Sequence, residues 1–217
     1  LELIRRHEGR FKVSFSISGT ALDQFEEYAP EVLESFQALG RTGCVEFLDE
    51  TYCHSLSFLF SREEFREQVR RHRDRIEELF NQSPRVFRNT ELIYHNDVAR
   101  EAEAMGYDAI LAEGADHVLG WRSPSWLYQP AGCTRLKLLL KNYALSDDIA
   151  FRFSNRDWPE YPLTADKFAA WAHAVNTHGE LINLFMDYET FGEHQWESSG
   201  IFEFMRALPD AVLRHPD

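Results

Sequence analysis

The sequence predicts an α/β protein built on a parallel sheet, either open or closed into a barrel. Short apolar runs typical of strands alternate with segments of helical periodicity along the whole chain. Strands that alternate with helices pair in parallel, because each helix returns the chain to the start of the next strand. The length of 217 residues suits one domain with a sizeable core.

The predicted strands are short and rich in β-branched, aromatic and aliphatic residues. Residues 181–186 (LINLFM) are the most hydrophobic of them, and residues 136–140 (LKLLL) are typical of a buried strand. In chain order, the predicted strands are residues 11–17, 44–48, 86–88, 108–111, 136–140 and 181–186.

The predicted helices are marked by apolar residues that recur on one face and by end signals. Ser61 and Glu64 form a capping box ahead of Phe65, Val69, Ile76 and Phe80. Further helices are predicted over residues 31–39, 96–105 and 164–175, with a last one beginning at residues 200–208. Residues 112–135 and 141–163 are predicted to be irregular, and long loops on a barrel rim are typical of binding loops.

The charge balance excludes some partners. The chain has 23 Lys and Arg against 36 Asp and Glu, a formal net charge of −13. Phosphate binding depends on clustered Lys and Arg, so we expect neither nucleic acid nor an anionic membrane as partner. The basic run at residues 66–75 alternates with glutamates and is typical of a solvated helix face. No apolar run reaches the ~20 residues of a membrane span, and no signal peptide opens the chain, so we expect a cytoplasmic protein.

Several common kinds of site have no signature in the sequence. Cys44, Cys53 and Cys133 lack metal-ligand spacing, and the 9 histidines are scattered. The chain also lacks a Gly-rich phosphate loop, a G-x-S-x-G elbow and an H-E-x-x-H motif. We therefore expect no metal and no cofactor, and carboxylates remain as the candidates for chemistry.

Carboxylates and one histidine follow three of the predicted strands. Glu50 and His54 follow the second, Glu91 follows the third, and Asp187 and Glu189 follow the last. In parallel α/β folds, the chemistry lies at the carboxyl ends of the strands. A pair of carboxylates facing one cleft suits glycoside hydrolysis. The alternative is structural, with Asp187 capping a helix and Glu91 paired with Arg88 on the surface.

Three segments stand out together: residues 46–56 (EFLDETYCHSL), 87–94 (FRNTELIY) and 185–194 (FMDYETFGEH). Together they resemble sequence regions of glycoside hydrolase family 57, in its α-amylase-like branch. Their order is that of the family, and the resemblance covers nearly the whole chain. The Asp-x-Glu-x-Phe-Gly pattern in the third segment is the most specific of the three.

This resemblance implies an incomplete (β/α)7 barrel, a retaining mechanism and α-1,4-linked glucan substrates. It implies Glu91 as the nucleophile and Asp187 as the general acid/base. Other residues are predicted to bind substrate or to orient Asp187: His54, Glu50, Asp116, His117, Trp121, Glu189 and His194.

Family members begin with a strand that carries a His-Gln-Pro segment, which this sequence lacks. We therefore expect residues 1–217 to be a single catalytic domain that belongs to a longer chain. Three alternatives stay open: a 4-α-glucanotransferase or branching enzyme of the same family, a metal-dependent polysaccharide deacetylase, and a glucan-binding domain without activity. The deacetylase would need a His/Asp metal cluster, for which His54 and His194 are the candidates.

Overall fold

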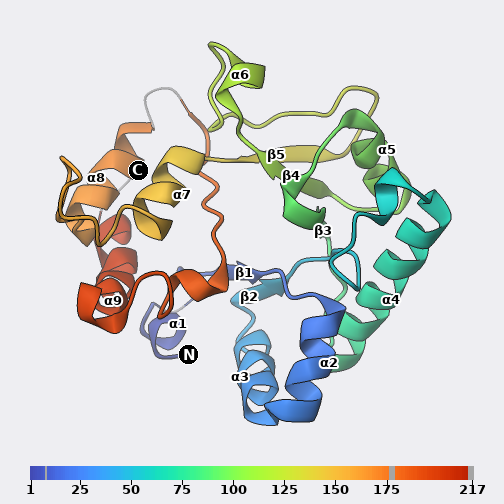
Figure 1. Cartoon of the computed structure of the whole chain (residues 1–217), viewed down its shortest axis with the longest axis horizontal. Coiled ribbons are helices and arrows are strands. Elements are labelled where there is room, and N and C mark those ends of the chain that lie inside the picture. The colour runs from blue at the N-terminus through green and yellow to red at the C-terminus, as the bar shows by residue number, and fades with distance from the viewer. Residues whose placement is uncertain (8, 176–178, 215–217) are drawn as a thin grey trace. The chain divides into compact units, whose positions relative to one another are not determined.

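The computed structural model describes residues 1–7, 9–175 and 179–214, which form an α/β fold with parallel strands (Figure 1). The chain divides into two compact units. The first contains Leu1–Ala112 and Tyr128–Leu138, and the second contains Glu113–Leu127 and Leu139–Asp217. None of the helices in the described part is long and apolar enough to cross a membrane.

Helices and short strands alternate along the chain, as the sequence predicts. The first unit and its boundary hold α1 (Glu2–Arg6), β1 (Val13–Phe15), α2 (Gly19–Tyr28), α3 (Pro30–Gly40), β2 (Val45–Phe47), η1 (Ser57–Leu59), α4 (Arg62–Phe80), β3 (Val86–Arg88), η2 (Thr90–Leu92), α5 (Asn96–Ala104), β4 (Ala109–Glu113) and β5 (Lys137–Lys141). The second unit holds α6 (Asp116–Leu119), α7 (Tyr143–Ala150), α8 (Ala165–Ala174), η4 (Tyr188–Thr190), η5 (Glu197–Ser199) and α9 (Ile201–Leu213).

The strands of the first unit pair in parallel. β1 pairs with β2 in the register Val13↔Val45, and β3 pairs with β4 in the register Val86↔Ala109. A parallel bridge between Asp49 and Phe87 joins the end of β2 to β3. The carboxyl ends of β1, β2 and β3 therefore lie at one edge, which is where the first unit's candidate residues follow their strands.

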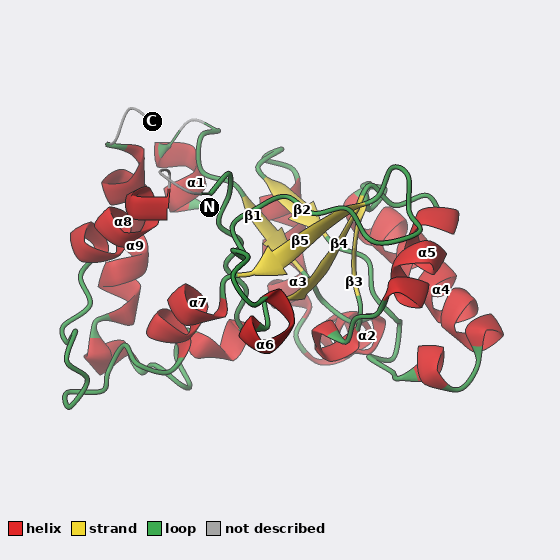
Figure 2. Cartoon of the chain, turned by 90° about the horizontal axis from the view of Figure 1, so that it is seen from above, coloured by secondary structure: helices red, strands yellow, loops and turns green. Residues whose placement is uncertain are grey.

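The core of the first unit is aromatic. The rings of Phe47 and Phe80 stack with their centroids 3.8 Å apart, and Phe65 and Ile76 are fully buried. These residues of α4 are the ones whose spacing predicts an inward face, so that prediction is confirmed. The Ser61 side chain accepts a hydrogen bond from the backbone N–H of Glu64 at 3.2 Å and caps α4. In Figure 2, α4 and α5 lie beside β3.

The second unit is built around α8 and α9, which pack against each other. Phe168 and Phe204 meet edge to face with ring centroids 5.9 Å apart, and Ile201 is fully buried beneath them. Gly200 precedes α9 with φ of 85°, a conformation that glycine adopts without steric cost. The predicted start of the last helix is confirmed.

The strand predicted at residues 181–186 is wrong. The segment makes an isolated bridge at Asn183, which pairs with Lys141, and Leu184 is exposed. One ladder bond is made, from the backbone N–H of Asn142 to the carbonyl of Asn183 at 2.8 Å, and side chains supply two further bonds. The Asn183 amide donates to the carbonyl of Leu140 at 3.0 Å, and the Ser146 hydroxyl accepts from the backbone N–H of Phe185 at 3.1 Å.

Three helices, α2, α6 and α7, lie where the sequence predicts no helix. The first residue of α2, Gly19, has no room for a side chain, because a Cβ there would lie 2.4 Å from the ring of Tyr52. The Tyr52 hydroxyl in turn donates to both carboxylate oxygens of Asp23 at 2.8 Å. This contact holds the segment after β2, which contains Glu50 and His54, against α2.

Candidate active site

Glu50 is a carboxylate buried at the end of β2, with only 1% of its surface exposed. Its Oε1 accepts a hydrogen bond from the Ser16 hydroxyl at 2.7 Å, and its Oε2 lies 3.1 Å from Nδ1 of His54. The Arg88 guanidinium lies 3.6 Å from the same Oε2. A buried charge is stable only when it is paired and hydrogen-bonded, and both oxygens of Glu50 meet that condition.

His54 lies between two carboxylates. Its Nδ1 faces Glu50, and its Nε2 lies 2.9 Å from Oε1 of Glu91. Carboxylates only accept hydrogen bonds, so both ring nitrogens must carry a proton when both acids are ionised. The array Glu50–His54–Glu91 is therefore a hydrogen-bonded chain of three groups, in which an imidazolium lies between two carboxylates.

Two of the three residues of the array, His54 and Glu91, have a strained backbone conformation. His54 has φ of 50° and Glu91 has φ of 54°, and residues other than glycine rarely adopt this left-handed region. The segments around them are joined by hydrogen bonds: the Thr90 hydroxyl donates to the carbonyl of Ser55 at 2.8 Å, and Thr51 and Thr90 hydroxyls lie 3.0 Å apart. Strain of this kind persists where the surroundings hold it, and it is frequent at active sites.

The protonation states agree with this geometry. Burial pulls the pKa of His54 down, but hydrogen bonds to Glu91 and Glu50 outweigh it, so the pKa lies above the ordinary value. The hydrogen bond from His54 lowers the pKa of Glu91, with the charges of His54 and Arg88 acting in the same direction and slight burial opposing them. Glu91 is also 70% exposed in its side chain, so it is an ionised carboxylate that a ligand can reach.

In the second unit, Asp187 directly precedes η4, and its side chain is exposed. Its backbone carbonyl accepts from the N–H of Thr190 at 3.1 Å, but its carboxylate does not cap the turn. Glu189 and His194 face each other, with Oε1 and Nε2 3.6 Å apart. Asp187 is thus close in sequence to a glutamate–histidine pair formed by Glu189 and His194. The predicted role of this pair in orienting Asp187 stays a prediction.

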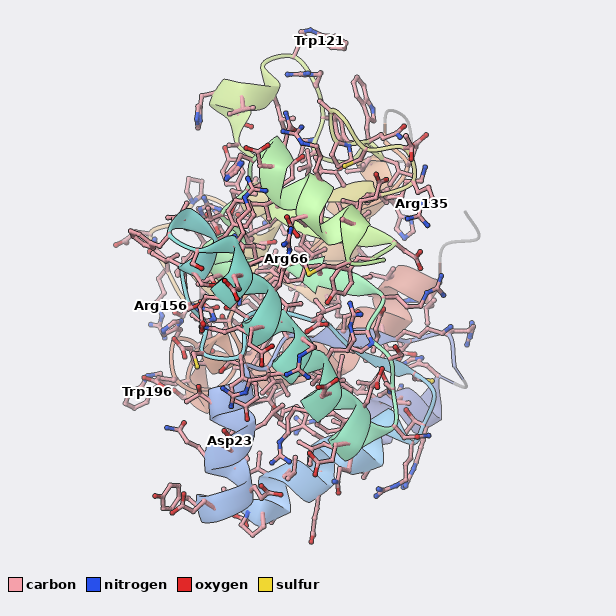
Figure 3. All side chains as sticks on the ribbon, turned by 90° about the vertical axis from the view of Figure 1, so that its right-hand side faces the viewer. Asp23, Arg66, Trp121, Arg135, Arg156 and Trp196 are labelled. Carbon is pink, nitrogen blue, oxygen red and sulfur yellow. The ribbon has the colours of Figure 1, made fainter. Side chains whose placement is uncertain are left out.

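The other predicted binding residues lie on or after α6. Asp116 accepts a hydrogen bond from the Tyr143 hydroxyl at 2.5 Å, and His117 is exposed on the same short helix. Trp121 is 84% exposed, and its ring meets Trp126 edge to face at 5.6 Å. Figure 3 shows Trp121 extending from the tip of its loop into solvent. An exposed indole face can stack on a sugar ring.

Two residues in contact with Glu50 are absent from the predicted site. Ser16 follows β1 and meets the same strand-end criterion, so this rule applied to all residue types would have found it. The structural alternative pairs Arg88 with Glu91, and the structure places the Arg88 guanidinium 3.6 Å from Oε2 of Glu50. The described residues contain no group of three or more His, Cys, Asp or Glu side chains placed to hold a metal ion.

Two comparisons with known proteins point to one family. The model of glycosyl hydrolase family 57 matches residues 1–216. A Methanocaldococcus jannaschii protein named "Putative alpha-amylase" is 52% identical over 217 residues, which cover 99% of this chain and 45% of that protein. This chain therefore spans less than half the length of that curated relative.

Solved structures show the same fold at low sequence identity. The 4-alpha-glucanotransferase from Thermococcus litoralis matches 99% of this chain and 33% of its own, with a TM-score of 0.77 and 17% identity. An exo-type maltose-forming amylase from Pyrococcus sp. ST04 matches 98% of this chain and 36% of its own, with a TM-score of 0.70 and 13% identity. Taken with the family match over nearly its full length, these findings mean that the chain belongs to glycosyl hydrolase family 57.

Proposed function

We propose that this chain is the catalytic part of a retaining glycoside hydrolase that cleaves α-1,4-linked glucans, with Glu91 as nucleophile and Asp187 as general acid/base. We further propose that its strands belong to an incomplete (β/α)7 barrel. Family membership and the name of the Methanocaldococcus jannaschii relative support the reaction class. The observation that carries the residue assignment is the array Glu50–His54–Glu91.

The array suits a nucleophile because it keeps Glu91 ionised without burying it. An attacking carboxylate must be charged and accessible, and it must not be protonated at working pH. His54 supplies the opposing charge at 2.9 Å, while the buried Glu50 holds the other side of the ring. If Glu91 only stabilised the fold, neither its strained backbone nor the buried Glu50 on the other side of His54 would be needed.

The reaction would proceed in two displacements at the anomeric carbon. Glu91 attacks that carbon while Asp187 protonates the departing glycosidic oxygen, which leaves a glycosyl ester on Glu91. Asp187 then deprotonates a water or a sugar hydroxyl that releases the ester. Hydrolysis and transglycosylation differ only in that last acceptor. The mechanism requires the two carboxyl groups to lie about 5–5.5 Å apart when substrate is bound.

We assign substrate contacts to the exposed polar and aromatic residues of the second unit. Trp121 would stack on a glucose ring, and Asp116 and His117 would bond hydroxyl groups of the same or a neighbouring ring. Glu189 and His194 would hold the turn that carries Asp187. The contacts of His54 with two carboxylates favour a charge-pairing role for it over sugar binding.

Product analysis with maltoheptaose tests this function. We expect the 217-residue chain to cleave maltoheptaose and to release products whose new reducing end is first formed in the α configuration, because two inversions restore the original one. Proton NMR of the anomeric signals measures the configuration, and chromatography measures chain length.

The products distinguish the possible activities. If all products are shorter than maltoheptaose, the reaction is hydrolysis, and longer products indicate transfer. First-formed β products would contradict retention. Glucan binding without turnover would favour a non-catalytic domain, and loss of turnover with chelator would favour a metal enzyme.

The substitution His54→Asn is expected to move the acid limb of the pH profile upward. A lowered pKa lets Glu91 stay ionised, and active, to more acidic pH, and this advantage is lost when the imidazolium is removed. Asparagine tolerates the left-handed backbone at residue 54, so the fold should survive. kcat/KM measured from pH 3 to 7 checks this. An acid limb at the same pH in both proteins would show that His54 does not set the ionisation of Glu91.

A further inference from the structure

His72 of α4 is a buried histidine with both ring nitrogens bonded to other parts of the first unit. Its side chain is fully buried. Nδ1 lies 2.6 Å from Oδ1 of Asp49, the residue that follows β2 by two positions. Nε2 lies 2.8 Å from the backbone carbonyl of Ile17, two positions after β1. One side chain thus joins α4 to the carboxyl ends of two adjacent strands.

The partners of Asp49 determine the charge of His72. Oδ2 of Asp49 accepts from the Tyr107 hydroxyl and lies 3.4 Å from Nε of Arg73, and Oδ1 accepts from the backbone N–H of Glu50 at 3.0 Å. With donors on both oxygens, Asp49 is the acceptor in its contact with His72, so Nδ1 of His72 donates to it at 2.6 Å. The backbone N–H of Glu50 also lies 3.4 Å from Nδ1, but its shorter bond, at 3.0 Å, is to Oδ1 of Asp49. The Ile17 carbonyl can only accept, so Nε2 must donate as well. His72 is therefore an imidazolium.

The charged groups around His72 agree with this state. Asp49 and Glu50 face it from the segment after β2, Tyr107 faces the same carboxylate from the segment before β4, and Arg73 comes from its own helix. Burial pulls the pKa of His72 down, but the hydrogen bond to Asp49 and the charges of Asp49 and Glu50 outweigh it, so the pKa is raised.

The two residues that His72 binds are chain neighbours of Glu50, which belongs to the array, and of Ser16, which donates to Glu50. Asp49 precedes Glu50, and Ile17 follows Ser16, whose hydroxyl donates to Glu50 at 2.7 Å. Glu50 then contacts His54, and His54 contacts Glu91. We propose that His72 is a positioning residue, an imidazolium that locks the ends of β1 and β2 to α4 and so holds Glu50 where it orients His54 and Glu91.

A role in stability alone does not account for this arrangement. Replacing a buried ion pair by apolar residues of similar volume is often neutral or even stabilising, so the pair by itself gives the fold little. Its geometric value is greater, because the imidazolium has two donors in fixed directions. One bonds the residue next to Glu50, and the other bonds the residue next to Ser16. The last step of this proposal, to Glu91, rests on the proposed function, but the step to Glu50 and His54 does not.

Nitrogen-15 NMR of the histidines tests the charge directly. In the wild-type chain we expect both ring nitrogens of His72 to be protonated at pH 7, where an ordinary histidine with a pKa near 6.5 is mostly neutral. A neutral His72 at pH 7 would overturn the proposal even without any variant.

The substitution His72→Gln tests the positioning role. We expect exchange of the His54 ring N–H with solvent to become about tenfold faster or more, because the charge-assisted hydrogen bond to Glu50 is loosened. We also expect kcat on maltoheptaose to fall by a similar factor with little change in KM. Arg70→Gln is the matched control: Arg70 is on the exposed face of the same helix, paired with Glu67 and Asp74, and should alter neither quantity.

The outcomes separate this proposal from the proposed function. Faster exchange at His54 in a chain without glycosidase activity would support the positioning role and contradict the assigned activity. Unchanged exchange and unchanged kcat in His72→Gln, with only a lower melting temperature, would show that His72 is merely structural.

Discussion

The substitution Glu91→Gln is expected to lower kcat on maltoheptaose by about 10³-fold or more, while binding of the glucan changes little. The amide is nearly isosteric with the carboxylate but cannot form the glycosyl ester, and it no longer pairs with the charge of His54. Steady-state kinetics measure kcat, and calorimetric titration with maltoheptaose measures binding. Glu63→Gln, an exposed carboxylate on α4, is the matched control and should keep wild-type turnover. Wild-type turnover in Glu91→Gln would show that Glu91 is structural.

The backbone at residue 91 allows a sharper version of this experiment. Because φ there is 54°, glycine is more compatible with the conformation than glutamate is. We expect Glu91→Gly to lose as much activity as Glu91→Gln yet to be at least as stable, since removal of the side chain relieves strain of order 1 kcal/mol. Added azide should restore part of the turnover and yield a β-glycosyl azide, because the anion attacks from the side that Glu91 has vacated.

The substitution Asp187→Asn is expected to lower kcat on maltoheptaose by about 10²–10⁴-fold, the usual contribution of general acid/base catalysis. The deficit should shrink strongly for an aryl maltoside with an acidic phenol, because such a leaving group departs without a proton. The comparison of kcat/KM for the two substrates measures this difference. Since the Asp187 side chain does not cap the turn that follows, the variant should fold normally.

Glu193→Gln is the matched control for Asp187, because Glu193 is an exposed acid in the same segment. It should leave both substrates unaffected. An equal loss of kcat/KM on maltoheptaose and on the aryl maltoside in Asp187→Asn would contradict the acid role and would favour a contribution to substrate binding instead.

The alternation of elements was readable from the sequence because it depends on local signals. The apolar face of α4 and the capping side chain of Ser61 are separated by only a few residues, so periodicity and spacing reveal them. The strand predicted at residues 181–186 failed for the opposite reason. A strand requires a neighbour to pair with, and Asn183 and Ser146 satisfy the backbone with side-chain hydrogen bonds that composition does not disclose.

Glu91 and Asp187 were found as candidates because catalytic residues follow strand ends and because three segments resemble those of one family. The residues that contact Glu91 were not found from the sequence. Sequence favoured Arg88 as the neighbour of Glu91, whereas the structure brings His54 to it from 37 positions away. The role of His72 was equally hidden, since it lies within the basic run at residues 66–75, which was interpreted as a solvated helix face.

By itself, then, the sequence determined the α/β class, the parallel pairing of its strands and the family, because these follow from periodicity and from short motifs. Only the tertiary structure decided which charges meet. Ser16, Glu50, His54 and Glu91 come from three different strand ends, and their protonation states follow from mutual distances of about one hydrogen bond. The energy of a charge depends on what lies within a few ångströms of it and not on its neighbours in the chain.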